Sequence, residues 1–149
     1  MRNLDDNNTI QPLYLPWQQT LLEQILSLKQ QARLPHAILI EAKSELSGAS
    51  FIWHLTMLLL CNNNQQIDPC GQCQSCSLML ANTYPDFSFI SLIQDSKTKK
   101  INKNIKIEQI RNLIHEVYLT RRYDNLKVVA THPAEKMRIA GANSILKTL

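Results

Sequence analysis

The sequence lacks the patterns that would place it in a membrane or direct it out of the cell. No apolar run reaches the roughly 18 residues that a membrane-spanning helix needs, and the longest, residues 51–60, is interrupted by His54. Residues 1–8 are polar and acidic and contain no apolar core of a signal peptide. We therefore expect a cytoplasmic protein that does not enter a membrane.

The chain also lacks a strong excess of charge. Its 149 residues carry a formal net charge of +4. If the four cysteines of the chain bound one divalent metal ion as thiolates, the net charge would fall to about +2. Five lysines do cluster, but the stretch has no interleaved aromatic residues and is rich in Ser, Thr and Asn, which favours a solvated loop. They are Lys97, Lys99, Lys100, Lys103 and Lys106. With 44% apolar and 19% charged residues, the composition indicates one ordered globular domain.

Cysteine is absent except in one short segment. The four cysteines are Cys61, Cys70, Cys73 and Cys76. Thiolates three residues apart can converge on one ion when the backbone between them turns tightly, and four thiolates suit a tetrahedral zinc ion with no open position. The segment therefore predicts a structural zinc site.

Two other interpretations of these cysteines stay open. A Cys-x2-Cys-x2-Cys run also occurs in iron–sulfur proteins, but there the fourth cysteine usually follows downstream with a proline after it, whereas Cys61 lies upstream. Disulfides or free thiols are less favoured because nothing directs the chain to an oxidising compartment. We predict zinc.

Helix and strand patterns alternate along the chain. Apolar residues at helical spacing predict helices, and short apolar or alternating runs next to breakers predict strands. Helices are expected at 17–31 (started by Pro16), 48–60, 77–81, 107–117 and 134–149, the last with Met137, Ala140, Ile145 and Leu146 inward. Strands are expected at 37–40, 86–92 and 127–131, the first and third of them buried. Such alternation is typical of an α/β domain with a parallel sheet.

A nucleotide-binding loop is not preserved at its expected place. After the first strand, a phosphate-binding α/β domain has Gly-x4-Gly-Lys-Ser/Thr. At those positions this chain has Ala42, Ser47, Gly48 and Ala49. After the third strand, where an acidic pair would order magnesium, it has His132-Pro133. We therefore expect no bound nucleotide and no catalytic residue.

Several segments together resemble a known family. They are Arg33-Leu34-Pro35-His36-Ala37, the run from Cys70 to Cys76, Tyr84-Pro85-Asp86, Ile107-Glu108-Gln109-Ile110-Arg111, Lys127-Val128-Val129, Pro133-Ala134-Glu135-Lys136-Met137 and the closing Ala142-Asn143-Ser144-Ile145-Leu146-Lys147-Thr148-Leu149. In this order they resemble the delta-prime family of clamp-loader subunits of bacterial DNA polymerase III, which is of the AAA+ class.

The resemblance implies a fold and a function. The fold would be a RecA-like AAA+ parallel sheet with flanking helices, forming a truncated domain over residues 1–149 whose C-terminal strands are absent. A zinc module would be inserted at 61–80. The function would be that of a non-catalytic subunit of the DNA polymerase III holoenzyme, acting in DNA replication. With gamma/tau and delta subunits it would help to load the sliding clamp onto primed DNA.

This chain departs from the family pattern at several positions. Tyr84 stands where the family usually has histidine, and Thr131-His132 replaces an apolar-acidic pair. A divergent AAA+ ATPase and an independent zinc-knuckle module that binds nucleic acid are the alternative functions. Nucleotide binding would favour the first alternative, and salt-dependent DNA affinity would favour the second.

Overall fold

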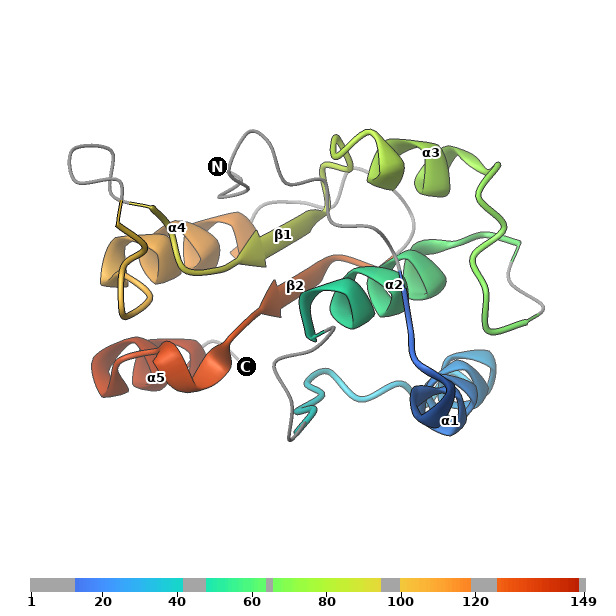
Figure 1. Cartoon of the computed structure of the whole chain (residues 1–149), viewed down its shortest axis with the longest axis horizontal. Coiled ribbons are helices and arrows are strands. Elements are labelled where there is room, and N and C mark those ends of the chain that lie inside the picture. The colour runs from blue at the N-terminus through green and yellow to red at the C-terminus, as the bar shows by residue number, and fades with distance from the viewer. Residues whose placement is uncertain (1–12, 42–47, 64–65, 95–99, 119–125, 148–149) are drawn as a thin grey trace. The chain divides into compact units, whose positions relative to one another are not determined.

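The computed structural model describes residues 13–41, 48–63, 66–94, 100–118 and 126–147. Within these residues the protein is mixed α/β, with five α-helices, two short 3-10 helices and a two-stranded sheet (Figure 1). The chain divides into two compact units, one of residues 10–84 and one that contains residues 85–149. None of the helices seen in the described ranges has the length and apolar character to cross a bilayer.

The first unit begins with an amphipathic helix. The 3-10 turn η1 (Pro16–Gln18) leads into α1 (Gln19–Gln30), which buries Leu22, Ile25 and Leu26. Proline fits this start because its fixed φ suits the first helical position and its missing N–H would have no partner there. The helix ends where Ala32 adopts a φ of +54° and the Arg33 N–H donates to the Leu28 carbonyl, a C-cap that precedes the predicted break at Leu34-Pro35.

Helix α2 (Gly48–Leu60) is the buried element of this unit. Phe51 and every residue from Trp53 to Leu60 are buried. A helix that is apolar on all sides must be covered on all sides, and α2 contacts both α1 and α3 (Gln74–Leu80). The predicted bounds of α2 are confirmed. Helix α3 begins three residues earlier than the predicted 77–81, at Gln74 within the cysteine run.

The second unit contains a parallel strand pair joined through a helix. Strands β1 (Phe87–Ile90) and β2 (Val128–Thr131) lie side by side, with Phe87 opposite Val128 and Ile90 opposite Thr131 (Figure 1). The connection contains α4 (Ile107–Tyr118), as parallel strands require a long crossover. These strands and this helix were predicted. The prediction that the strand at 127–131 is buried is wrong, because β2 is only half-buried and Val129 is 37% exposed.

A small apolar core lies against α4. It is built on Ile90, Ile105, Ile110 and Leu113, with Leu92, Ile114, Met137 and Ile145 packed around it. Helix α5 (Ile139–Leu146) approaches α4 closely at Gly141, where an added Cβ would lie 2.3 Å from Ile110 Cδ1. Glycine at this position therefore lets the two helices come together.

The predicted helix at 134–149 is not continuous. The structure has a 3-10 turn, η2 (Ala134–Lys136), then an extended Met137, then α5. Met137 is extended because this segment pairs with Ile105, whose N–H donates to the Lys136 carbonyl at 3.0 Å. Met137 and Ile145 pack inward as predicted, but Ala140 is exposed. The side chain of Leu146 lies outside the described residues.

The predicted buried strand at 37–40 is wrong for the described structure. These residues belong to no strand, and Ile38 and Leu39 are 39% and 90% exposed. An apolar run favours burial, but a strand also needs a hydrogen-bonded neighbour, and the sheet in the described ranges consists of β1 and β2. The predicted three-stranded sheet is therefore seen in part. Residues 42–47, Lys97 and Lys99 lie outside the described residues.

Two leucine substitutions test the exposure of residues 37–40. Leu39→Ala should change the free energy of unfolding by less than about 0.5 kcal/mol, since an exposed side chain loses few contacts. Leu22→Ala, at a fully buried position of α1, should lower it by about 2–5 kcal/mol. Denaturant titration followed by circular dichroism measures both. A loss for Leu39→Ala as large as that for Leu22→Ala would show that residues 37–40 are buried in solution.

Candidate metal centre

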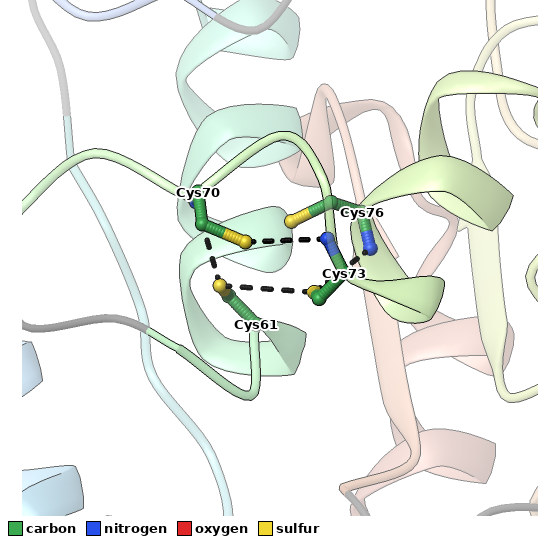
Figure 2. Close-up of side chains that lie close together, drawn as sticks. All are labelled: Cys61, Cys70, Cys73 and Cys76. Carbon is green, nitrogen blue, oxygen red and sulfur yellow. Dashed lines mark hydrogen bonds between the residues drawn. The ribbon is translucent and has the colours of Figure 1, made fainter.

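The structure brings the four predicted ligands together. Cys61 directly follows α2, Cys70 and Cys73 lie in the loop that follows, and Cys76 lies in the first turn of α3. Figure 2 shows the four side chains pointing toward one another. Their sulfur atoms all lie within 4.8 Å of one another.

The turns around the cysteines follow from backbone hydrogen bonds to sulfur. The Cys73 N–H lies 3.3 Å from Cys70 Sγ, and the Cys76 N–H lies 3.5 Å from Cys73 Sγ (Figure 2). Cys73 is thereby the N-cap of α3. Gly71 has a φ of +70°, which residues with a Cβ rarely adopt, so glycine suits the first of these two turns.

Cys61 is tied to both ends of the loop that follows it. Its sulfur accepts from the Asn63 N–H at 3.4 Å and from the Cys70 N–H at 3.5 Å. Hydrogen bonds of this kind stabilise the charged form of the acceptor. The loop is therefore arranged around sulfur atoms that can carry negative charge.

The sulfur spacing fits a single tetrahedral ion. Zinc–sulfur bonds of about 2.3 Å place the four sulfurs about 3.8 Å apart. The Cys61 and Cys73 sulfurs are 3.9 Å apart, and no pair exceeds 4.8 Å. This separation is far longer than the ~2.05 Å of a disulfide bond, and all four cysteines are free thiols. A zinc ion would therefore shorten any edge by no more than about 1 Å.

The four thiols differ in acidity because their surroundings differ. Burial raises the pKa of Cys61 and Cys76. Backbone N–H groups of Gln72 and Cys73 lower the pKa of Cys70 to about 6. At Cys73, burial acts to raise the pKa, but the N–H groups of Asn62 and Cys76 outweigh it and the pKa is lowered. The site thus combines two thiols of lowered pKa, Cys70 and Cys73, with two of raised pKa, Cys61 and Cys76.

His54 belongs to the support of the site rather than to its ligands. Its Nε2 lies 3.0 Å from the Ile67 carbonyl oxygen, in the loop between Cys61 and Cys70. Asp68 lies 3.8 Å from the same nitrogen, and the Tyr14 ring centroid lies 4.8 Å from that of His54. His54 is 4% exposed. Among the described residues, the candidate metal ligands are the four cysteines.

The sequence patterns did not predict that Lys29 contacts the candidate site. This residue of α1 donates from Nζ to the carbonyl oxygens of Leu58 at 3.5 Å and Cys61 at 3.3 Å. Burial lowers the pKa of Lys29, and the charge of the Cys61 thiolate acts in the opposite direction. A lysine in a predicted amphipathic helix gives no local signal of such a contact, because its partners lie about 30 residues away.

The remaining predicted positions are those where the residues of a phosphate-binding loop and of a magnesium-ordering acidic pair are replaced. Gly48 and Ala49 form the first turn of α2, while Ala42 and Ser47 lie outside the described residues. His132 follows β2, and its N–H donates to the Ile90 carbonyl at 2.9 Å. The His132 backbone therefore extends the pairing with β1.

The fold and the site define a class of protein: a mixed α/β chain that carries a four-cysteine site of the size of one metal ion. Comparison with known proteins is more specific. Residues 17–149 match the family described as "DNA polymerase III, delta subunit", and the chain belongs to this family.

Similar proteins from several bacteria are named DNA polymerase III subunit delta'. The chain is 32% identical over 134 residues to the DNA polymerase III subunit delta' of Pseudomonas aeruginosa, 34% identical over 134 residues to that of Haemophilus influenzae and 29% identical over 136 residues to that of Escherichia coli. These matches cover 90%, 90% and 91% of this chain, but only 38%, 38% and 39% of the relatives. The resemblance found in the sequence is therefore confirmed, and the chain spans less than half the length of these relatives.

Thiolate absorbance should reveal the acidity of Cys70. In the metal-free reduced chain, one thiol should ionise near pH 6, since Cys70 has a pKa of about 6, while Cys61 and Cys76 should ionise only above the ordinary thiol pKa. The step near pH 6 should be lost in Cys70→Ser. Cys76→Ser is the control and should keep it. A native curve with no ionisation below the ordinary thiol range would contradict the assignment.

Proposed function

We propose that Cys61, Cys70, Cys73 and Cys76 bind one zinc ion and that residues 61–80 form a metal-binding module of this chain. Four sulfurs within 4.8 Å support this more than an iron–sulfur cluster, because a cluster of several irons needs its cysteine ligands farther apart than a single ion does. Bound zinc would link the end of α2 to the start of α3.

The proposed role of the zinc is structural. Four thiolates fill a tetrahedral zinc ion and leave no position for a substrate or an activated water molecule. Cys61 and Cys76 are 2% and 1% exposed, as expected of ligands within the packed part of a unit. Because the thiols must be deprotonated, metal binding energy would contribute to local folding.

We infer that the chain is part of a clamp-loader subunit of DNA polymerase III, of the AAA+ class, that acts in DNA replication in the cytoplasm. The family match and the delta' names of the relatives support this inference. Its proposed partners are the gamma/tau and delta subunits, and through the complex the sliding clamp and primed DNA.

The proposed role in the loader is non-catalytic. Ala42, Ser47, Gly48 and Ala49 replace the glycines, lysine and hydroxyl that hold nucleotide phosphates and magnesium. His132-Pro133 follows β2 where a magnesium-ordering acidic pair would stand. The subunit would then contribute shape and contacts rather than ATP hydrolysis, which argues against the alternative of a divergent ATPase.

Replacement of one ligand tests the metal centre. The native chain should contain one zinc ion, and Cys73→Ser should weaken zinc binding by more than about 100-fold, since loss of an outer-shell partner alone costs about 10–100-fold. Elemental analysis and competition with a chelating dye measure this. In hydrogen exchange, residues 61–80 should lose protection while β1 and β2 keep theirs, because the strands belong to the other compact unit.

Serine at position 73 isolates the metal contribution. Cys73 is the N-cap of α3, and serine is a favourable N-cap, so Cys73→Ser keeps the cap while removing the thiolate. Ser77→Ala, at an exposed position of α3, is the matched control and should bind zinc normally. Iron in place of zinc, or unchanged zinc affinity in Cys73→Ser, would overturn the proposed centre.

A reconstituted loading reaction tests the role in replication. The reaction contains the gamma/tau and delta subunits of the same organism and this protein in its native form. Clamp loading onto primed DNA should fall at least about tenfold when this protein is left out. The physical reason is that a scaffold subunit completes the assembly on which the partners act. Clamp retained on circular primed DNA is the measured quantity, and full activity without the protein would refute the proposal.

A nucleotide-binding measurement tests whether the proposed role is non-catalytic. The protein alone should show no saturable ATP binding at micromolar concentrations, because the phosphate-binding residues are replaced. Gly48→Lys combined with Ala49→Thr should not restore hydrolysis, since Ala42, Ser47 and His132 would still differ from a working site. Micromolar ATP affinity of the native protein would favour the ATPase alternative instead.

A further inference from the structure

The contact of Lys29 with the end of α2 carries an inference that rests on the proposed metal centre. Lys29 is half-buried on α1, and its Nζ donates to the carbonyl oxygens of Leu58 and Cys61 at 3.5 and 3.3 Å. Leu58 lies in the last turn of α2, and Cys61 is the ligand that follows this helix. One ammonium group therefore connects α1 to the backbone of a metal ligand.

Two sources of negative charge meet at this point. The last carbonyl groups of a helix carry partial negative charge, equivalent to roughly half an elementary charge for the whole helix. A zinc ion with four thiolates has a net charge of about −2. A cation beside both is favourable, and partial burial at Lys29 reduces the screening of its charge by solvent.

The contact of Lys29 also affects where the Cys61 sulfur lies. Cys61 is separated from Cys70 by eight residues, whereas Cys70, Cys73 and Cys76 are fixed by two consecutive turns. The position of the Cys61 sulfur therefore depends on the end of α2 being held in place. Lys29 contacts this end from α1, and His54 holds the following loop through the Ile67 carbonyl.

We propose that Lys29 is a positioning residue of the metal centre. Its ammonium group holds the backbone of Cys61 and offsets part of the negative charge of the metal-bound thiolates, and it thereby strengthens the binding of a divalent metal ion. Lys29 does not ligate the metal. Its contribution comes through the Cys61 backbone and through charge.

Cobalt(II) binding to the reduced full chain tests this role. Cobalt bound by thiolates gives sulfur-to-metal charge-transfer absorption, which reports the ligand set, and competition with a chelating dye gives the affinity. Lys29→Met should weaken cobalt and zinc binding about tenfold, the lower end of the range for outer-shell partners. Lys29→Arg should bind within about threefold of the native chain, because it keeps the charge and can donate to the same carbonyls.

Three further measurements separate the effect of the Lys29 charge from the effect of its packing. Lys103→Met removes one exposed lysine outside the unit that holds the cysteines and should leave affinity unchanged. Raising the salt concentration from about 0.1 M to about 1 M should reduce the difference between the native chain and Lys29→Met, since salt screens charge. If Lys29→Met does not fold, Lys29→Gln replaces it and should bind cobalt more weakly than Lys29→Arg.

Each result has a distinct meaning. Charge-transfer absorption in the native chain, with weaker and salt-sensitive binding in Lys29→Met, supports the proposal. Normal absorption with equal affinity in the native chain and Lys29→Met overturns the role of Lys29 and leaves the metal centre intact. Loss of stability in Lys29→Met, equal in metal-free and metal-bound protein, also overturns it, because it shows a purely structural contact. Absence of charge-transfer absorption in the native chain overturns the four-cysteine centre itself, and the role of Lys29 with it.

Discussion

The unit formed by residues 10–84 depends on the burial of one helix. Helix α2 is covered along almost its whole length, and α1 and α3 pack against it. Fully burying a large apolar side chain contributes about 1.5–3 kcal/mol, so this helix supplies much of the driving force that folds the unit. Cys61 directly follows the buried helix, and its position is fixed by the same packing. His54 on α2 and Lys29 on α1 then hold the segments on either side of that cysteine.

The cysteine cluster is organised by backbone amides before any metal is considered. N–H groups from the turns point at sulfur, and they favour ionised thiols at Cys70 and Cys73, while burial disfavours them at Cys61 and Cys76. A bound metal ion would favour the deprotonated form of all four thiols, including the two whose pKa burial raises. The asymmetry follows from the fold, because Cys61 and Cys76 belong to the packed helix ends.

Prediction from the sequence succeeded where a local pattern was sufficient. Helix α2 follows from an apolar run long enough for a helix, and β1 and β2 follow from short β-prone runs separated by a helical segment. It failed where the outcome depends on a distant partner. Residues 37–40 have the composition of a strand but no neighbour within the described ranges, and Met137 is extended because it pairs with Ile105.

The sequence by itself determined the set of candidate metal ligands and the absence of the Gly-x4-Gly-Lys-Ser/Thr residues at 42–49, because both are questions of which side chains stand at which spacing. It also carried the family resemblance. Only the tertiary structure decided that the four sulfurs converge to within 4.8 Å, that their acidities differ, and that Lys29 contacts Cys61. The physical reason is that burial, electrostatic attraction and hydrogen bonds between residues far apart in the chain arise from packing, which no local pattern encodes.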